Sequence, residues 1–600
     1  MSKYGKRSVI AAFVAAAVAT SGFVSTAAAD SGQGNDQGNG LGEIQTLVVI
    51  YAENRSFDNL FGAYPGANGL SQTSPNSATQ LDRDGTIMTQ LPPVWGGTDG
   101  QDAATGHKAA ITSGAPVAVQ PLTEAQTEQY FTVNQINHPF SLLALYDSLS
   151  LANSNPLQYT NRDLYHRFYE NQMQINGGSN NKFAAWADSG GLVMMYIPNN
   201  DDDHPLWGLA RQNVLADNFF QSAYGGSYLN HQFLICSCAP VYPNDGNSPP
   251  APFNKNGTAP TPSVVSLVNG VWTLTTKAPP ASPVHAGDGP PAFVNSSTLT
   301  PAFNGTFYSI NTMQPPYPPS ANAKAGLKPN QQVNLGLSNT LPPQSQTTIG
   351  DLLTAAGVDW AYYSGAWQFA LDNAPNPTAP PQYSLANPNF QYHHQPFNYF
   401  QAFDPGTPAG AANRAAHLKD AGVVTPGDVT GGTLPDSQFL TDINTGNLPP
   451  VTFYKPHGTV NEHNGYANVT DGDRHIAAVV AALQQSSQYR HMLIVITYDE
   501  NGGIWDHVAP PKGDMFGPGS RIPALIVSPF VKQGFVDHTQ YDTTSILRFI
   551  TRKWHLPVLP GITSRDAALV ANGYPPMGDL TNALRGGGSD NSVGNNGKGH

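Results

Sequence analysis

Two stretches of this 600-residue chain place acidic and amide side chains directly after a run of apolar residues. The apolar runs are Thr46–Ala52 and Met492–Tyr498, and the polar residues after them are Glu53, Asn54, Asp499 and Glu500. If the runs form neighbouring strands, these carboxylates raise one another's pKa unless a cation neutralises them. The simplest interpretation is one divalent metal ion held by oxygen ligands. The alternative is that each acid caps the following helix or pairs with Arg55.

A serine follows a pair of glycines in the segment Ala223–His231, with the sequence AYGGSYLNH. Ser227 is predicted to lie at the start of a helix, where a hydroxyl can sit close to a metal ion and beside free backbone N–H groups that suit an anion. This pattern predicts a nucleophile. An ordinary helix-capping serine fits the same spacing.

Several histidines cluster near predicted strand ends and loops. They are His166, His393, His394, His463 and His507, the last directly after Asp506. An isolated histidine is usually an ordinary surface or core residue without a binding or catalytic role. A cluster beside carboxylates is better explained as ligands of phosphate or metal, or as proton donors.

The elements that must position these groups alternate between strands and helices. Strands are predicted over 45–52, 214–219, 358–363, 450–455, 491–498 and 522–528, and helices over 55–62, 227–236, 348–356, 471–486 and 543–555. Fully apolar strands between helices predict an α/β fold with a mainly parallel central sheet covered by helices on both faces. In such sheets ligands bind beyond the carboxyl ends of the strands, where the acidic residues are expected.

One large domain is predicted over residues 44–580, with Pro-, Ser- and Asn-rich insertions near 66–125 and 240–345 that could contain small hairpins. Residues 30–43 read as a disordered linker and 585–600 as a disordered Gly-rich tail.

The first 29 residues resemble a secretory signal peptide. A basic start is followed by an Ala-rich apolar segment over 9–24 and by small residues that end at Ala29. A membrane anchor is the alternative, but the apolar segment is short for a span. The protein is therefore expected to be secreted or periplasmic. Cleavage changes the formal net charge from −13 to −16, which argues against a nucleic-acid partner.

Only two cysteines are present, Cys236 and Cys238. The spacing allows either a tight disulfide or two buried thiols.

Seven motifs together resemble the phosphoesterase family that contains bacterial phospholipases C and secreted acid phosphatases, within the alkaline-phosphatase-like superfamily. They are Ala52–Asp58, His166–Gly178, Gly225–Ser227, Asn461–His463, Gly465–Tyr466, Tyr498–Gly503 and Asp506–Val508. The motifs are spread from about residue 45 to 555. Phospholipase relatives usually carry Thr in a Gly-Pro-Thr setting, so Gly226-Ser227 favours the acid phosphatase branch.

The resemblance implies a role for each matching residue. Ser227 is the nucleophile, and the metal ligands are Glu53, Asn54, Asp499, Glu500 and Ser227. His166 and His463 are catalytic residues beside Ser227. The phosphate pocket is lined by His166, His393, His394, His463, His507 and Asp506, with Asn230. The leaving alcohol is protonated by His463 or, failing that, by His393 or His394. Protonated histidines around a phosphate predict an acidic pH optimum.

One segment departs from the family pattern. Ser179, Asn180 and Asn181 stand where the family usually has charged residues, which puts the contacts of that loop in doubt.

Three functions remain open at this stage. They are a phosphomonoesterase, a phospholipase C or other phosphodiesterase that contacts membrane lipid transiently, and a non-catalytic secreted binding protein. Metal identity and oligomeric state stay open.

Overall fold

A computed structural model describes most of the chain between residues 40 and 586. The residues outside the description are 1–39, 99–120, 150–155, 199–203, 243–264, 269–270, 275–283, 292–298, 302–306, 324–330, 334, 336–339, 374–389, 425–433 and 587–600. The predicted signal peptide lies outside the described residues, as do nearly all of the predicted linker and Gly-rich tail and much of both insertions.

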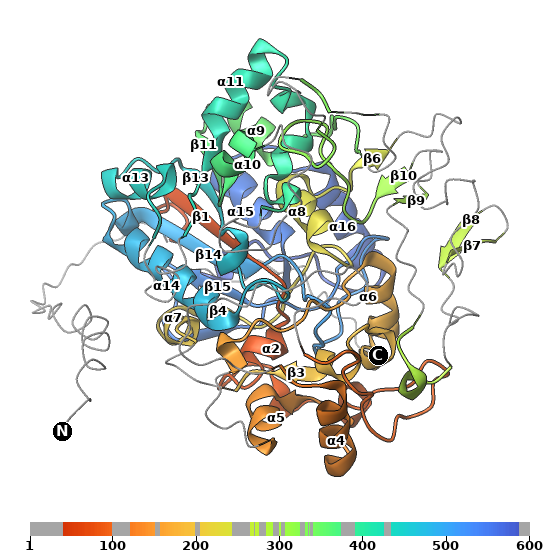
Figure 1. The fold of residues 1–600 in the computed structure, drawn as a ribbon. Coiled ribbons are helices and arrows are strands. Elements are labelled where there is room, and N and C mark those ends of the chain that lie inside the picture. Colours follow the sequence, from red (N-terminus) through yellow and green to blue (C-terminus); the bar gives the residue numbers. More distant parts are fainter. Residues whose placement is uncertain are drawn as a thin grey trace, which may run out of the picture. The chain divides into compact units, whose positions relative to one another are not determined.

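The centre of the fold is an eight-stranded sheet (Figure 1). Its strands, in spatial order, are β12 (Leu418–Asp420), β11 (Trp360–Ser364), β13 (Val451–Lys455), β1 (Thr46–Ala52), β14 (Met492–Tyr498), β15 (Ala524–Val527), β4 (Val214–Ala216) and β16 (Phe535–Asp537). Only β15 pairs antiparallel with its neighbours; the other pairings in this sheet are parallel. The predicted α/β class with a mainly parallel sheet is confirmed.

The strands form because their residues can be buried on both faces. All seven residues of β1 and all seven of β14 are buried. Continuous apolar runs of this kind are typical of parallel strands covered on both sides. Such strands place their carboxyl ends at one edge of the sheet, and that edge carries the polar groups discussed below.

Two groups of helices cover the sheet (Figure 1). In one group α7 and α13 contact α14, and in the other α9 and α15 contact α8. The helices are α2 (Phe57–Phe61), α3 (Pro75–Ala78), α4 (Glu124–Asn134), α5 (Leu142–Ser148), α6 (Phe168–Ile175), α7 (Leu206–Gln212), α8 (Ser227–Cys236), α9 (Ile349–Ala355), α10 (Trp367–Asn373), α11 (Pro408–His417), α13 (Gln438–Thr445), α14 (Val469–Gln485), α15 (Thr544–Lys553) and α16 (Pro560–Ala571). Among the described residues, no helix combines the length and apolar character needed to cross a bilayer.

The strand predicted over 214–219 is wrong in one respect, because the structure divides it. β4 ends at Ala216, and β5 (Phe219–Phe220) pairs instead with β17 (Tyr541–Asp542) in a separate two-stranded sheet. The chain turns at Asp217, whose carboxylate accepts a hydrogen bond from the backbone N–H of Asn68 at 2.7 Å. A polar residue committed to that contact cannot continue a buried apolar strand.

Smaller sheets lie outside the centre. β2 (Phe140–Ser141) pairs with β3 (Met195–Tyr196), and β10 (Phe307–Ser309) lies between β6 (Val241–Tyr242) and β9 (Leu299–Pro301). The second insertion also contains the hairpin β7 (Val265–Val268) and β8 (Val271–Leu274), as its short apolar group suggested.

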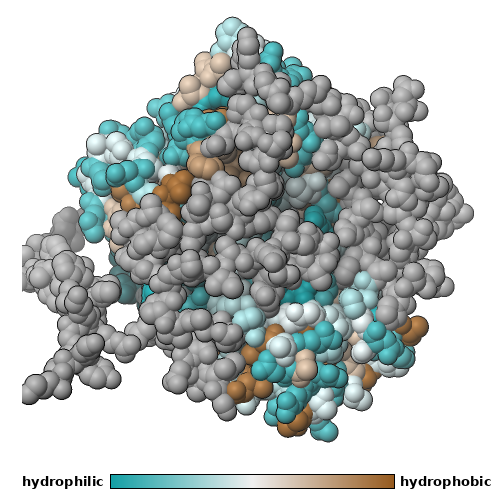
Figure 2. Space-filling model, viewed as in Figure 1, coloured by the Kyte–Doolittle hydropathy of each residue, from teal (hydrophilic) through white to brown (hydrophobic). Residues whose placement is uncertain are grey.

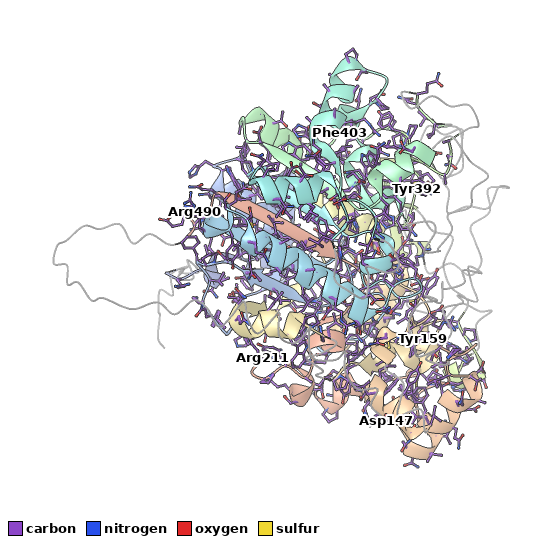
Figure 3. The ribbon with its side chains drawn as sticks, turned by 60° about the vertical axis from the view of Figure 1, so that its left-hand side comes forward. Asp147, Tyr159, Arg211, Tyr392, Phe403 and Arg490 are labelled. Atoms are coloured by element: carbon purple, nitrogen blue, oxygen red, sulfur yellow. A yellow bond between two sulfur atoms is a disulfide. The ribbon has the colours of Figure 1, made fainter. Side chains whose placement is uncertain are left out.

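Arg490, just before β14, and Tyr392, in the short 3-10 helix Tyr392–His394, lie on opposite sides of the view in Figure 3. Hydrophobic side chains are scattered among hydrophilic ones on the described surface in Figure 2. Val133 of α4, for example, is 72% exposed. Scattered exposure of this kind is ordinary for a protein surface.

Cys236 and Cys238 form a disulfide at the end of α8, with 5.1 Å between their Cα atoms. The pairing that the sequence left open is therefore resolved in favour of the bridge.

Candidate active site

β1 and β14 lie side by side, so the two acidic strand ends meet. Ala52 is paired with Tyr498, and the backbone N–H of Asp499 donates to the Ala52 carbonyl at 3.1 Å. The Asp499 carboxylate accepts from the backbone N–H of Asn54 at 3.0 Å, although 445 positions separate the two residues. The condition on which the shared site depended, that these strands are neighbours, is met.

Asn54 has an unusual backbone conformation. Its φ of 57° lies in the left-handed region, which asparagine tolerates better than most residues. Gly502 closes over it, because a Cβ on Gly502 would lie 2.7 Å from the Asn54 carbonyl oxygen. This turn directs the Asn54 side chain toward Ser227. Strained backbone held by its surroundings often occurs at functional sites.

Ser227 is the first residue of α8, and Gly226 rather than Ser227 is the N-cap. The Ser227 hydroxyl oxygen lies 3.3 Å from Asn54 Oδ1 and 3.2 Å from Glu500 Oε1, and its one proton can be donated to either acceptor. The alternative of an ordinary capping serine is therefore wrong. The first turn of a helix also has backbone N–H groups without intrahelical partners, which favours an anion near this hydroxyl.

Asn230 has a different place from the one predicted. Its Oδ1 accepts from the Ala223 backbone N–H at 2.9 Å, and its Nδ2 donates to the carbonyls of Ala223, Gly225 and Gly226 at 3.1, 3.4 and 3.2 Å. The amide is thus occupied with the loop before Ser227. These contacts hold the loop before Ser227 in place, and they engage both ends of the amide that was expected to bind phosphate.

Asn54, Ser227, Asp499 and Glu500 form what we call the oxygen-rich half of the site. Burial raises the pKa of Asp499 to about 7, and the neighbouring charge of Glu53 adds to the effect. Burial and the charge of Asp499 likewise raise the pKa of Glu500 well above its usual value. Asp499 Oδ2 is buried and accepts no hydrogen bond from any described residue. Carboxylates in this state, together with amide and hydroxyl oxygens, fit a hard divalent cation.

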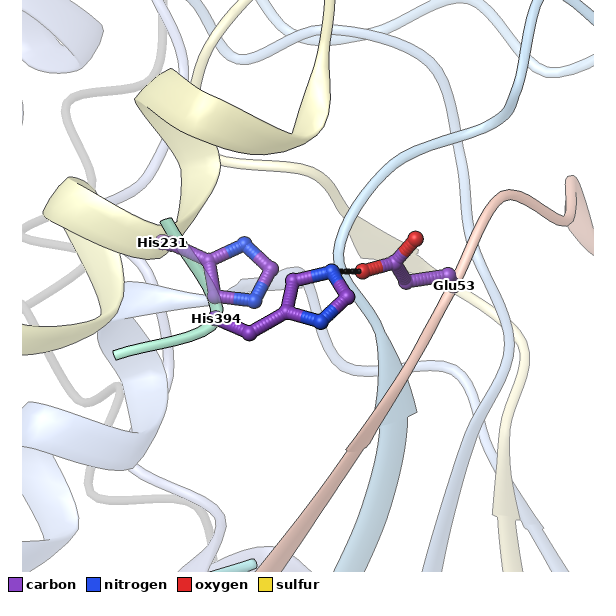
Figure 4. Close-up of side chains that lie close together, drawn as sticks. All are labelled: Glu53, His231 and His394. Atoms are coloured by element: carbon purple, nitrogen blue, oxygen red, sulfur yellow. Dashed lines mark ion pairs between the residues drawn. The ribbon is translucent and has the colours of Figure 1, made fainter. Parts of the chain in front are cut away.

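His231, His393, His394 and Lys455 form the histidine-rich half. Lys455 ends β13, and its Nζ lies 2.7 Å from Glu53 Oε1. His394 Nε2 contacts the same oxygen, and the His231 ring stacks on the His394 ring with 5.5 Å between centroids (Figure 4). Burial alone would raise the pKa of Glu53, but His394 and Lys455 outweigh it and hold that pKa well below its usual value.

Glu53 lies between the two halves. It influences the pKa of Asp499 on one side, and it contacts Lys455 and His394 on the other. Its Oε2 accepts from the Tyr466 hydroxyl at 2.9 Å. Glu53 caps no helix, because the N-cap of α2 is Ser56, and the Arg55 guanidinium donates to the Glu462 carbonyl at 2.7 Å. The alternative interpretation of this acid as a helix cap is wrong.

His166 and His463 lie at the more exposed side of the site. Their rings are 5.7 Å apart, edge to face. His166 Nε2 lies 3.4 Å from Glu500 Oε1 and 3.4 Å from Asn54 Nδ2. His463 Nε2 points toward Glu53 Oε2 at 3.8 Å, while its Nδ1 contacts the Asn464 carbonyl. Burial lowers the pKa of His463 to about 3 and also lowers those of His231, His393 and His394.

Asp506 and His507 lie in a separate cluster with Asp58 and Arg521. Asp506 Oδ1 accepts from Arg521 Nε at 3.0 Å, and His507 Nδ1 lies 2.7 Å from Asp58 Oδ2. None of the hydrogen bonds and ion pairs seen among the described side chains links either residue to Ser227 or Glu53. The structure therefore does not bring these two residues together with the other predicted phosphate ligands.

The loop that departs from the family pattern supports that cluster. Asn180 Nδ2 donates to the carbonyls of Asp506 and Val508, both at 2.9 Å. The Asn180 amide thus holds the backbone of this cluster in place, and this role does not require a charged side chain.

Lys455 and His231 were missed by the sequence-based reasoning. Lys455 ends a buried strand next to β1, so the signal that identified Glu53 and Asp499 could have identified it. His231 lies four residues after Ser227 on α8, one helical turn away and on the same face. Its Nδ1 lies 2.8 Å from the Ser227 carbonyl.

The sequence profile of the phosphoesterase family matches residues 44–557. Phospholipase C B from Mycobacterium tuberculosis is 27% identical over 171 residues, which are 24% of this chain and 31% of that protein. Non-hemolytic phospholipase C from Burkholderia pseudomallei is 28% identical over 278 residues, which are 40% of this chain and 35% of that protein. This chain thus aligns with about a third of the length of these relatives.

Among solved structures, the chain is similar to a phosphonate monoester hydrolase from Silicibacter pomeroyi, with a TM-score of 0.15 and 21% identity. The similarity covers 22% of this chain and 23% of that chain. A protein of the alkaline phosphatase superfamily from Vibrio parahaemolyticus gives a TM-score of 0.20, 13% identity and 37% and 50% coverage. Similarities this weak carry no conclusion about function.

Proposed function

This chain belongs to the phosphoesterase family, and we propose that it is a secreted, metal-dependent phosphoric ester hydrolase that uses Ser227 as nucleophile. One observation carries the proposal: the Ser227 hydroxyl lies within 3.3 Å of both Asn54 and Glu500, at the first residue of a helix. Three distant segments of the chain thus meet at one hydroxyl. A nucleophile needs this combination of an activating group and an anion site.

The oxygen-rich half would hold one divalent ion, with Glu53 as the carboxylate on its border. A bound divalent ion supplies positive charge that keeps Asp499 and Glu500 ionised and makes the Ser227 hydroxyl more acidic.

The chain's own residues supply the remaining steps. Ser227 Oγ forms a bond to phosphorus while the bond to the leaving oxygen breaks, and Glu500 Oε1 is placed to accept the serine proton. His463 Nε2 donates a proton to the leaving alcohol. The product is a phosphoserine, which water hydrolyses in the second step, with the same histidine as the base. His166 and the α8 N-terminus orient the phosphoryl oxygens.

A phosphate monoester is the favoured substrate. A monoester carries a second negative charge that a diester lacks, and a divalent ion in the oxygen-rich half together with the free backbone N–H groups at the start of α8 would offset it. The low pKa of His463 means that acid is needed to protonate it, which supports the predicted acidic optimum. Secretion rests on the predicted signal peptide over 1–29.

A phospholipase C is the second candidate, because the relatives described above carry that name. A cavity of about 410 Å³ also lies beside the loop before Ser227, and its lining combines Met173, Trp186 and Tyr224 with polar groups that include Lys182 and Lys512. Tyr224 is three residues before Ser227 in the same loop. This cavity could take part of a lipid.

A paired assay tests the proposal. The purified protein is assayed with p-nitrophenyl phosphate and with p-nitrophenylphosphorylcholine, beside Ser227→Ala and the exposed control Ser148→Ala. Monoester turnover that is lost only in Ser227→Ala supports the proposal. Diester turnover alone favours the phospholipase, and turnover that survives Ser227→Ala contradicts the assigned nucleophile. Absence of any turnover in the metal-loaded wild type favours a binding protein.

A further inference from the structure

Lys455 is a fully buried lysine at the carboxyl end of β13. Its Nζ lies 2.7 Å from Glu53 Oε1, 3.5 Å from the Ala52 carbonyl and 5.6 Å from the centre of the Tyr51 ring. All three partners belong to β1 or follow it directly. A buried ammonium group is expensive unless it is paired, and this one is matched to a single carboxylate.

The groups around that carboxylate are those of a metal site. The ligand atoms of Glu53, His231 and His394 all lie within 4.8 Å of one another (Figure 4). Two imidazoles with one carboxylate are a donor set that zinc accepts. His231 Nε2 is buried and has no hydrogen-bond partner among the described residues. Asp499 Oδ2 lies 3.8 Å from the other nitrogen of that ring.

We propose that Lys455 is the resident cation of this histidine-rich half and stands where these three side chains would otherwise hold a second divalent ion. An ammonium group and a divalent ion on the same carboxylate oxygen would repel each other strongly in the protein interior. The two therefore exclude each other. Of the two halves of the site, only the oxygen-rich half then takes a divalent ion.

The consequence for catalysis rests on the proposed function. Lys455 fixes a positive charge next to the histidines without any dependence on metal supply. It also holds the Glu53 carboxylate in place between His394 and His463, so we classify it as a positioning residue.

A count of bound metal tests the inference and does not require turnover. Wild type, Lys455→Met, Lys455→Arg and the control Lys419→Met, from the edge strand β12, are stripped with chelator and dialysed against micromolar zinc. Elemental analysis should give one ion per chain in wild type, Lys455→Arg and Lys419→Met, and two in folded Lys455→Met. The double variant Lys455→Met/His231→Gln should return to one.

Two zinc ions in wild type, or one in folded Lys455→Met, would overturn the inference. A second measurement on wild type covers the case in which Lys455→Met does not fold: the X-ray absorption spectrum of its single zinc should show oxygen ligands. Imidazole scattering in that spectrum would overturn the inference. Correct metal counts in a protein without esterase activity would contradict the proposed function and leave this inference standing.

Discussion

The oxygen-rich and histidine-rich halves of the site stand on neighbouring strand ends, yet they balance buried charge in opposite ways. In the first, Asp499 and Glu500 share a buried space, and the pKa of each is raised. In the second, Lys455 and His394 contact Glu53, and the pKa of this carboxyl is lowered. The carboxyl groups of Glu53, Asp499 and Glu500 lie at the same edge of the sheet. Protein cations neutralise only the first of them.

The difference indicates where a metal ion is needed. Where the chain supplies its own cation, a carboxylate is stable without one. Where it does not, burial favours the protonated form of the carboxyl groups, and a divalent ion that binds there displaces their protons. Among the described residues, only histidines and no lysine or arginine pair with Asp499 and Glu500, so we expect metal binding and activation of Ser227 to be coupled on that side of the site.

The largest expected effect comes from breaking the oxygen-rich half. Asp499→Asn removes a negative charge and an oxygen ligand together, so we expect kcat to fall by about 1,000-fold or more and metal affinity to fall with it. Steady-state kinetics and equilibrium dialysis measure the two effects. The exposed control Asp147→Asn should change neither. Wild-type metal affinity in Asp499→Asn would show that the ion binds elsewhere.

A smaller, substrate-dependent effect is expected at His463. Removing a proton donor costs about 100- to 10,000-fold when the leaving group needs a proton. His463→Ala should therefore lose far more kcat with an alkyl phosphate than with p-nitrophenyl phosphate, whose leaving group departs as an anion. Equal losses with both substrates would contradict its assignment as the general acid.

The pH dependence of metal binding tests the raised pKa values of the oxygen-rich half. Burial raises the pKa of Asp499 from 3.8 to about 7, so a proton competes with the ion below that pH. Because the pKa of Glu500 is raised as well, metal affinity should weaken by about tenfold or more for each pH unit below 7. In the metal-free protein, the stabilisation from protonated Asp499 is complete below its unfolded pKa and is lost as the pH rises through about 7.

Calorimetric metal titrations and thermal melts between pH 4.5 and 8 measure both effects. Metal-free protein should melt at a lower temperature as the pH rises, and the loaded protein should reverse the trend. Metal affinity independent of pH would contradict the raised pKa.

The smallest expected effect concerns the loop before Ser227. Asn230→Ala removes the hydrogen-bond partner of the Ala223 backbone N–H and carbonyl. The loss should reduce the free energy of unfolding by about 1–3 kcal/mol. Denaturant unfolding measures the change. The exposed control Asn572→Ala should cost much less. If Asn230 bound phosphate instead, KM would rise without a comparable loss of stability.

The sequence predicted the parts of the fold that have a strong local pattern. The apolar runs before Glu53 and Asp499 could only be buried strands, and polar residues at their carboxyl ends had to meet if the strands were adjacent. The pairing itself needs the whole sheet, because 445 residues separate Asn54 from Asp499. Likewise, nothing local showed that the predicted strand over 214–219 would divide between two sheets.

The site was predicted less completely for the same reason. Lys455 has the local signal of a polar residue at a strand end, but its meaning depends on β13 lying next to β1. Asp506 and His507 look like site residues in sequence, and only tertiary structure pairs them with Asp58 and Arg521. Motifs therefore indicated which residues matter, and packing decided which of them meet.

Diffraction from crystals of the metal-loaded wild-type protein, with anomalous data at the absorption edge of the bound metal, tests the central claim most directly. The account predicts one peak in contact with Asn54, Ser227, Asp499 and Glu500, and Lys455 still paired with Glu53. A peak in contact with His231 and His394, with Lys455 displaced, would contradict it.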